Sequence, residues 1–582
     1  MPSKDSHHTT NQAAGTTRRL WPYIKRHKGL ASVSLVSVIL FAATGRAIPL
    51  VFGFAIDKGI TQKNLNLVYY AAGAYLILEL SRSGFAFCKD YFIARLGNRV
   101  LFQVREDLIR HVQNLPARFF DQTPVGRIIT RVTNDVVSLQ DFFHDGVNSM
   151  FVMSLELLTI LVALAYISLP LTLIIILTLP PALWMSLKIS RQLRADFREA
   201  KSKLSTINAF TAESLNGMKI LQLYNRAPHT REKFAGYSEE YRALQMKTVR
   251  GFAKLWPILS YFDALTVALS LFFGAIFFTR SQITIGELSA FLLLAQSFFK
   301  PVRAILERFN QFQNSLASAD RIFALIDEPE EILEGQRFAT TPLKGEVEFK
   351  NLTFKYDKES RPVLKNINLK IAPGESVALV GRTGSGKSTM VSLLQKLYNF
   401  EDGDILVDGQ SLSKLSTQEL RQRIGVVRQD HFLIRGTIRD NISLYNEEIS
   451  NDAIFEAALK ANCDDLIQRS GHGLDTLVEE RGANLSVGEK QLISFARVLA
   501  YNPDILILDE ATANIDSHSE QLIQEATIEA TKGRTSIIIA HRLSTILHCD
   551  RIVVLHDGEI VEMGSHQKLM ETKGKYWEYQ NQ

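Results

Sequence analysis

The sequence predicts an all-α membrane domain with six spanning helices and long cytoplasmic helix extensions, followed by an α/β domain built around a phosphate-binding loop. A chain of 582 residues is too long for one hydrophobic core and should divide into separately packed units. Uncharged apolar runs recur between residues 30 and 306, whereas Val/Ile-rich strands alternate with amphipathic helices beyond residue 343. We expect a disordered cytoplasmic tail over residues 1–17, the membrane domain over 18–325, a linker over 326–343 and the α/β domain over 344–582.

Composition narrows the class of protein. The net charge is +5, but no basic stripe interleaved with aromatic residues occurs in the second half, which argues against nucleic acid as a partner. The three cysteines, Cys88, Cys463 and Cys549, are far apart and lack metal-ligand spacing, so a disulfide framework is not expected. The first apolar run, residues 30–56, is far longer than the core of a cleavable signal peptide.

Six apolar stretches are long enough to cross about 30 Å of hydrocarbon as helices. They cover residues 30–56, 67–87, 151–169, 171–187, 255–279 and 283–306. The third and fourth form one nearly continuous run, which Ser168, Leu169 and Pro170 interrupt. Because proline ends a helix, we expect a tight hairpin there.

Charge predicts the orientation of these helices. Lys and Arg residues precede the first span and crowd the connections over residues 95–131 and 188–254, so these segments should be cytoplasmic. The short turns between the other spans carry few positive charges and should face outward. Both termini are therefore expected inside the cell.

The two inner connections are too long to be loops and have helical apolar spacing, so the spanning helices should extend into the cytoplasm. Pro124 and Gly126 break the periodicity within residues 119–126, and Gly217 does so near Glu213 and Leu215. Each break predicts a short helix that docks on a cytoplasmic domain.

Ionisable residues within the spans are costly in lipid and should face the interior of the bundle or one another. These residues are Arg46, Glu79, Arg82, Glu156 and Asp263. Two interpretations remain open: an internal ion pair, such as Arg46 with Asp263, or a substrate pathway lined by carboxylates.

A phosphate-binding loop follows the predicted buried strand at residues 376–380 and precedes a helix. Glycine-rich backbone N–H groups can wrap phosphates here, Lys387 can reach the β and γ phosphates, and Ser388 can hold Mg²⁺. The loop comprises Gly381, Arg382, Thr383, Gly384, Ser385, Gly386, Lys387 and Ser388, with Thr389 next in the helix.

A second strand, residues 505–508, delivers two adjacent carboxylates to its carboxyl end. Asp509 can bind Mg²⁺, and Glu510 can act as the general base that polarises the attacking water. The alternative is that the pair only caps a helix in solvent, which the phosphate-binding loop makes the weaker interpretation.

Further motifs carry a family resemblance. Residues 485–489, Leu-Ser-Val-Gly-Glu, resemble the signature motif of ATP-binding-cassette (ABC) proteins, and Gln429, Asp516 and His541 resemble their Q-loop, D-loop and switch histidine. Tyr356 lies where the family places an aromatic ring that stacks on adenine. The likeness covers nearly the whole chain and matches bacterial multidrug-resistance-like half-transporters with the type I exporter fold.

The resemblance implies two cassettes packed head to tail, with each ATP between one chain's phosphate loop and the other chain's signature segment. Ser486 and Gly488 would then contact the partner's nucleotide, while Gln429 and His541 would position metal and water. The usual signature is Leu-Ser-Gly-Gly-Gln, so Val487 and Glu489 should weaken that contact through bulk and like-charge repulsion. This departure favours a heterodimer with a second half-transporter over a homodimer.

The resemblance further implies an ATP-hydrolysing exporter of the bacterial inner membrane that moves hydrophobic or amphipathic compounds, with drugs as first candidates. A lipid or peptide exporter is the main alternative, and an ATP-gated channel is a weaker one. ATP and Mg²⁺ are the expected cofactors, and membrane lipid and a small amphipathic substrate are the other expected partners.

Overall fold

The computed structural model describes residues 18–339, 342–357, 360–469, 471–509, 517–540 and 543–581, apart from the side chains of residues 144, 145, 147–149, 309, 310, 517 and 544. It divides into two compact units. The first comprises residues up to Gln113 together with Pro124–Glu328, and the second comprises Asn114–Thr123 together with the chain from Pro329 onward. Each unit is described by itself.

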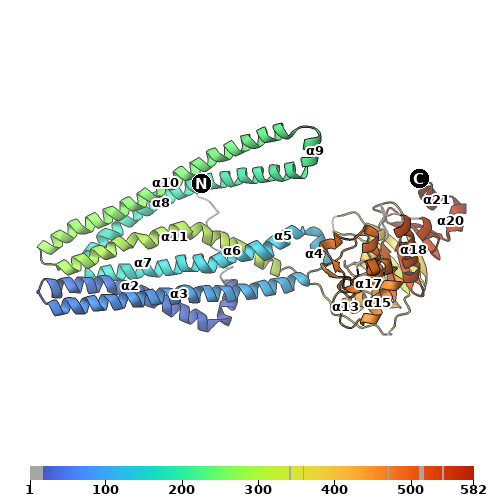
Figure 1. Ribbon diagram of the computed structural model, residues 1–582, viewed down its shortest axis with the longest axis horizontal. Helices are drawn as coiled ribbons and strands as arrows, with labels where there is room; N and C mark the ends of the chain where they lie inside the picture. Colours follow the sequence, from blue (N-terminus) through green and yellow to red (C-terminus); the bar gives the residue numbers. More distant parts are fainter. Residues whose placement is uncertain are drawn as a thin grey trace. The chain divides into compact units, whose positions relative to one another are not determined.

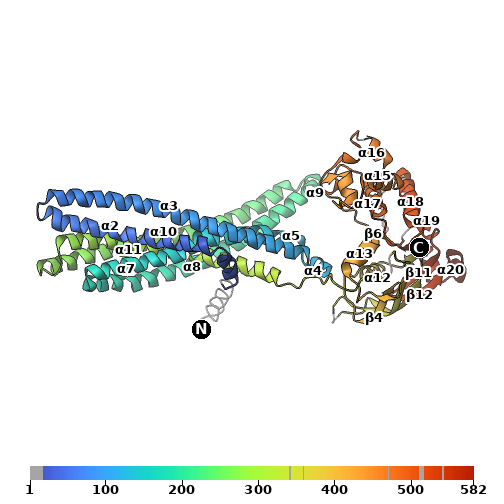
Figure 2. The ribbon, with the colours of Figure 1, turned by 90° about the horizontal axis from the view of Figure 1, so that it is seen from below.

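Long helices build the first unit, which confirms its all-α class (Figure 1). A helical stretch over residues 18–26 precedes the long helices α2 (Lys28–Phe54), α3 (Leu65–Gln113), α7 (Met153–Ile167), α8 (Leu169–Asn216), α10 (Ala227–Thr279) and α11 (Ile285–Ile326). In both views α2 runs beside α3 and α8 runs beside α10 (Figures 1 and 2).

Short helical segments join the long ones. They are η1 (Ala55–Ile60), α5 (Val125–Thr130), η2 (Arg131–Asp135), α6 (Val136–Asp141), η3 (Phe142–Val152) and α9 (Met218–Leu223). Ser168 adopts an extended conformation between α7 and α8, and Pro170 follows in the first turn of α8, so the predicted hairpin break is present. α9 begins directly after Gly217 and connects α8 to α10, as the predicted break required (Figure 1).

Five helices of the described chain are long and apolar enough to cross a membrane: Lys28–Ile60, Met150–Ile167, Leu169–Asn216, Ala227–Thr279 and Ile285–Ile326. The predicted span 67–87 lies within α3, which is not among these five. Glu79 and Arg82 lower its apolar character. Leu76, Ile77 and Leu80 nevertheless project 62–66% exposed from α3, an apolar surface of the kind that lipid covers.

The second unit contains two principal sheets, which confirms its α/β class. One has the strand order β12-β11-β3-β10-β9-β6, and the other has the order β2-β1-β4-β5. The first comprises β3 (Ser376–Val380), β6 (Ile424–Val427), β9 (Ile505–Asp509), β10 (Thr535–Ile539), β11 (Arg551–His556) and β12 (Glu559–Gly564). The second comprises β1 (Val347–Phe354), β2 (Leu364–Ile371), β4 (Asp402–Val407) and β5 (Gln410–Ser411).

All neighbours in the six-stranded sheet are parallel except β11 and β12. Helices and the second sheet cover its faces, which is why Ile505, Leu506 and Ile507 of β9 are fully buried in succession. β7 (Gly436–Thr437) and β8 (Leu477–Val478) form a separate two-stranded antiparallel sheet, with α14, α15 and α16 between them in the chain.

The helices of this unit are α4 (Ala117–Gln122), α12 (Lys387–Leu394), α13 (Thr417–Arg423), α14 (Ile438–Ser443), α15 (Asn451–Lys460), α16 (Asp464–Arg469), α17 (Val487–Tyr501), α18 (Ser517–Thr531), α19 (Leu543–Ile546), α20 (His566–Thr572) and α21 (Lys575–Gln580), with single turns η4 (Gly473–Asp475) and η5 (Glu480–Gly482).

Candidate functional site

The carboxyl edge of the six-stranded sheet gathers the predicted nucleotide-binding residues. β3 leads into the loop that begins at Gly381, β9 ends at Asp509, and Gln429 follows β6 by two residues. Since β3, β10, β9 and β6 are successive parallel strands, their carboxyl ends lie along one edge. This is the edge at which open α/β sheets bind ligands.

The loop after β3 has a backbone that its glycines make possible. Gly384 and Gly386 have φ values of 85° and 104°, a region that other residues rarely adopt. A Cβ atom on Gly386 would lie 2.6 Å from the side chain of Leu364, so no larger residue fits. Ser385 Oγ is buried and lacks a hydrogen-bond partner in the described structure, which suits a group whose partner is a ligand.

Lys387 opens α12 and turns back over the loop. Its Nζ donates hydrogen bonds to the carbonyl oxygens of Gly381 at 2.7 Å and Arg382 at 3.0 Å. Burial lowers the pKa of Lys387, while the charge of Asp509 acts in the opposite direction. The ammonium group is thus held by carbonyl dipoles next to the backbone that would wrap a phosphate.

A cavity of about 660 Å³ unites these elements. Its lining includes Tyr356, Val363, Thr383, Gly384, Gly386, Lys387, Ser388, Thr389, Gln429, Asp509 and Ile539. Residues that lie far apart in the sequence therefore face one space of a size suited to a nucleotide. Gly381, Arg382 and Ser385 belong to the same loop but are not among this lining.

Tyr356 stands at one side of the cavity, 38% exposed. Its hydroxyl lies 3.0 Å from Thr389 Oγ1, which anchors the side chain to α12. Edge-to-face contacts with Phe354 and Tyr398, each with ring centroids 5.0 Å apart, fix the ring further. A partly exposed, fixed aromatic ring beside a phosphate loop is suited to stacking on a base.

Three of the predicted site residues, Glu510, Asp516 and His541, lie outside the described residues. Asp509, which precedes Glu510 in the chain, is the last residue of β9.

The oxygen donors present fit Mg²⁺. Ser388, Gln429 and Asp509 all line the cavity and offer hydroxyl, amide and carboxylate oxygens, the ligands that this hard cation takes. Within the described chain, no group of three His, Cys, Asp or Glu side chains is placed to hold a metal ion by itself. A site of this kind suits a cation that also takes oxygens from bound phosphates.

The signature segment forms the start of α17. Ser486 is the N-cap residue and makes a capping box with Glu489: Ser486 Oγ accepts from the Glu489 N–H at 3.2 Å, and the Glu489 carboxylate accepts from the Ser486 N–H at 2.8 Å. Gly488 is buried in the first turn, whereas Val487 is 54% exposed.

The charge of Glu489 is compensated, which revises the expected repulsion. Arg469 at the end of α16 donates to the Glu489 carboxylate at 2.5 Å. Burial raises the pKa of Glu489, but the hydrogen bonds from Ser486 and Arg469 outweigh it, so the pKa lies below its ordinary value. The larger side chain of Val487, at a position where the usual signature has glycine, remains the main difference between this segment and the usual signature.

Residues 114–123 pack within the second unit, although the sequence places them inside a connection between membrane spans. Asp121 of α4 accepts a hydrogen bond from the Tyr398 hydroxyl, and Arg118 pairs with Asp357 at 3.0 Å. The predicted short docking helix is therefore present, at residues 117–122. Tyr398, Asp357 and Arg469 were not predicted, because none belongs to a motif with fixed spacing.

The ionisable residues of the membrane helices pair differently from the example expected. Arg46 lies 3.8 Å from Glu156, not beside Asp263, because α2 packs against α7 at this depth. Glu79 lies 3.8 Å from Arg82 one turn along α3. Asp263 interacts electrostatically with Arg303 and Lys300. Glu156 and Glu79 are thus each paired with a cation, whereas Asp263 forms no ion pair within 4.0 Å among the described residues and its Oδ1 is buried without a hydrogen-bond partner.

Comparisons with known proteins agree along the chain. Residues 32–302 match the family described as ABC transporter transmembrane region, and residues 364–513 match the family described as ABC transporter. The chain is 36% identical over 89% of its length to a probable multidrug resistance ABC transporter ATP-binding/permease protein of Bacillus subtilis, of which it covers 76%. It is 32% identical over 97% of its length to an ATP-dependent lipid A-core flippase of Syntrophus aciditrophicus, of which it covers 94%.

Among solved structures, a bacterial Atm1-family ABC exporter with ATP bound is similar. The TM-score is 0.77 at 27% identity, and the match covers 94% of this chain and 97% of that one.

Proposed function

This chain belongs to the ABC transporter family as an ATP-driven exporter, and from that premise we propose that it is a half-transporter that expels hydrophobic or amphipathic compounds, drugs first, across the bacterial inner membrane. ATP hydrolysis is coupled to transport in this family. The observation that carries the proposal is the cavity in which Tyr356, Lys387, Gln429 and Asp509 meet. Both termini face the cytoplasm in this proposal, because Lys and Arg crowd the inner connections.

We propose the following roles for the site. Tyr356 stacks on adenine, and the backbone N–H groups of residues 381–389 hold the phosphates together with Lys387. Lys387 exchanges its hydrogen bonds to the Gly381 and Arg382 carbonyls for phosphate oxygens. Glu510 takes the proton of the attacking water, and His541 and Gln429 position that water.

Mg²⁺ would be held by Ser388, Asp509 and Gln429, and when bound it neutralises charge on the β and γ phosphates. The side chains themselves orient the nucleotide and keep the phosphates against the loop.

The family works as a dimer, and we propose a heterodimer. Ser486, Gly488 and Asp516 would complete the nucleotide site of the partner. The exposed Val487 adds bulk where the partner's phosphate should approach, so the site that uses this chain's signature segment should hydrolyse ATP slowly. A partner with a standard signature would complete a fast site at this chain's Lys387. A homodimer is the alternative.

Amphipathic cargo is favoured over strongly cationic cargo. Glu156 is paired with Arg46, Glu79 with Arg82, and Asp263 lies near Arg303 and Lys300, so these carboxylates do not form a net acidic pathway. Replacing Asp263 by Asn tests the alternative, a substrate pathway lined by carboxylates. A selective loss of resistance to cationic drugs in this variant would support that pathway.

Lipid is the second candidate substrate. It is favoured by the similarity to a relative described as a lipid A-core flippase, which spans nearly the whole chain. Substrate stimulation of ATPase activity separates the two candidates.

The experiment reconstitutes the chain in lipid nanodiscs, alone and with a candidate partner half, and measures Mg-ATPase activity against panels of drugs, lipids and peptides. The proposal expects drug stimulation, with activity restored or raised by the partner. Lys387→Ala should abolish nucleotide binding, and Glu510→Gln should retain binding but lose turnover. Full turnover in either variant would refute the assigned site, and brisk activity of the chain alone would count against the heterodimer.

A further inference from the structure

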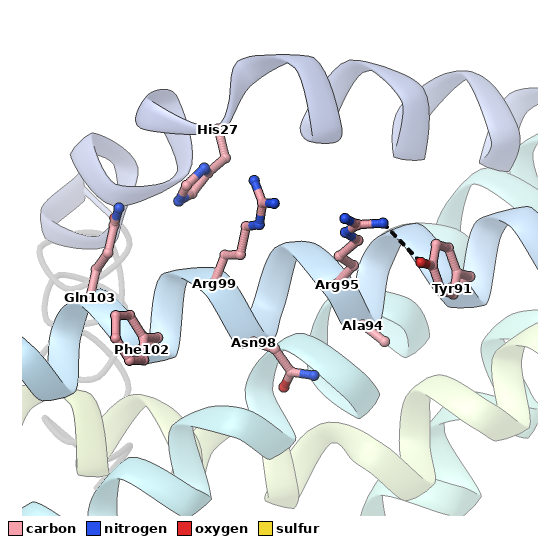
Figure 3. Close-up of a pocket in the computed structure, with 8 residues that line it drawn as sticks. All are labelled: His27, Tyr91, Ala94, Arg95, Asn98, Arg99, Phe102 and Gln103. Atoms are coloured by element: carbon pink, nitrogen blue, oxygen red, sulfur yellow. Dashed lines mark hydrogen bonds between the residues drawn. The ribbon is translucent and has the colours of Figure 1, made fainter.

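A groove of about 590 Å³ lies in the first unit between the turn at His27 and one face of α3. Figure 3 shows Arg95 and Arg99 rising from α3 toward this turn, with the imidazole of His27 facing the guanidinium of Arg99. The nucleotide site does not involve this groove, since all of its lining residues belong to the first unit.

The cations of the groove lack counter-charges. Arg95 donates to the Tyr91 hydroxyl at 2.8 Å, which is a neutral partner. No carboxylate of the described chain forms an ion pair with Arg95 or Arg99. The exposed side chains of Lys25, Arg26 and Lys28 flank His27 and add to the same positive field.

The nearest carboxylates of α3 are already engaged. Asp90 pairs with Lys89 at 3.2 Å, and Glu106 pairs with Arg110 at 3.1 Å. Asp107 accepts a hydrogen bond from Tyr23 at 3.1 Å, which ties the helical stretch 18–26 to α3. Asp107 keeps its charge but does not line the groove, so Arg95 and Arg99 remain available to an external anion.

Two polar atoms in the groove point to a ligand. His27 Nε2 and Gln103 Oε1 are buried and have no hydrogen-bond partner within the described residues. Buried polar atoms are normally satisfied, so an orphaned pair beside two guanidinium groups that have no carboxylate partner is typical of a site whose ligand supplies the missing partners. The imidazole nitrogen suits a phosphate oxygen, and the amide oxygen suits a hydroxyl donor.

We expect the groove to lie at the depth of lipid headgroups. α2 begins at Lys28, and the charged part of α3 begins beyond the predicted span 67–87, so both helices leave the apolar layer here. Phe102, which lines the groove, is 69% exposed, and Trp21, six residues before His27 in the chain, is 61% exposed, as expected of aromatic residues at a membrane interface.

We propose that this groove binds the phosphate headgroup of an anionic phospholipid of the cytoplasmic leaflet. Arg95, Arg99 and His27 contact the phosphate, Gln103 accepts from a headgroup hydroxyl, and Phe102 lies against the acyl chains. Basic pockets beside spanning helices attract such lipids through charge and hydrogen bonds together. The leaflet follows from the proposed orientation, whereas the site itself does not depend on the transported substrate.

The test uses fluorescence quenching by brominated lipids in a full-length chain that keeps Trp21 alone, with Trp184, Trp256 and Trp577 changed to Phe. Brominated phosphatidylglycerol is compared with brominated phosphatidylcholine at equal mole fraction. We expect stronger quenching by phosphatidylglycerol. R95Q/R99Q should lower its apparent affinity about 25-fold, roughly fivefold for each cation removed near an anionic lipid.

R191Q/R198Q is the matched control, because it removes the same charge from two exposed arginines of α8 that lie outside the groove, and it should keep the preference. Equal quenching by the two lipids, or an unchanged preference in R95Q/R99Q, would overturn the proposal. Millimolar inorganic phosphate should not displace the lipid, and complete displacement would assign the groove to free phosphate instead. Basal ATPase activity of each variant shows separately whether the proposed nucleotide site remains intact.

Discussion

The guanidinium group of Arg469 donates a hydrogen bond to the carboxylate of Glu489 at 2.5 Å, so the end of α16 neutralises the charge at the start of α17. Glu489 lies in a signature segment where a neutral residue is usual. In the proposed dimer, this ion pair would allow a carboxylate to be tolerated close to the partner's triphosphate.

Arg469→Gln should lower the ATPase rate of the assembled transporter about two- to fivefold, because Glu489 would repel the phosphates while a partly exposed ion pair contributes modestly. The steady-state ATPase rate measures this. R469Q/E489Q should recover most of the rate, since the double variant has neither charge. A double variant as slow as R469Q would mean that Arg469 acts independently of Glu489.

The sequence predicted the residues that line the cavity better than the contacts that hold them in place. Gly384, Gly386 and Lys387 follow a fixed spacing that one backbone conformation requires, so sequence alone located the loop. Arg469 was missed because it lies 20 residues from Glu489, and only packing of α16 near α17 brings the two together. The partner of Arg46 could not be chosen either, because helix rotation and depth decide between Glu156 and Asp263.

Tyr398 connects α4 with the nucleotide cavity. Its hydroxyl donates to Asp121, and its ring meets the ring of Tyr356. Burial, followed by the hydrogen bond to Asp121, raises the pKa of Tyr398, so the phenol keeps its proton and remains a donor at physiological pH.

Tyr398→Phe should leave basal ATPase activity within about twofold but reduce stimulation by substrate, because α4 loses a bond to the cavity wall while both rings remain. Stimulated and basal rates in nanodiscs give the ratio. Tyr445→Phe is the control, as it removes a hydroxyl from a 63% exposed ring elsewhere in the unit. Unchanged stimulation in Y398F would show that this contact does not transmit the signal.

Cys463 should be inert until the second unit unfolds. The residue is fully buried, and burial raises the pKa of its thiol to about 12. Because the unfolded chain ionises this thiol nearer pH 9, the raised pKa means that the contribution of the protonated thiol to the free energy of unfolding is kept below pH 9 and lost as pH rises toward 12.

Maleimide labelling of C88S/C549S should therefore stay slow and nearly constant from pH 7 to pH 9. Labelling of C88S/C463S, which keeps the half-buried Cys549, provides the comparison. Rapid labelling of Cys463 in the native transporter would contradict the observed burial.

Gly53 allows α2 and α11 to approach closely at one end of the membrane bundle. A Cβ atom on Gly53 would lie 2.6 Å from the carbonyl oxygen of Gly286, closer than side-chain carbons approach backbone. Asp57 strengthens the same junction by accepting from the Thr284 hydroxyl at 2.5 Å and from the Gly286 N–H at 2.8 Å.

Gly53→Ala should destabilise the membrane unit by about 1–3 kcal/mol, the usual cost of overpacking, since the obstructing atom belongs to backbone and cannot rotate away. The midpoint of thermal unfolding in detergent measures the loss. Gly73→Ala on α3 is the matched control, because a Cβ there meets no atom within 4 Å and alanine also favours the helix. G73A should therefore unfold at the wild-type temperature or slightly above it. If G53A unfolded at the same temperature as G73A, the close approach of α2 and α11 at Gly53 would not contribute to stability. The hydrogen bonds of Asp57 would then have to be made with the two helices farther apart.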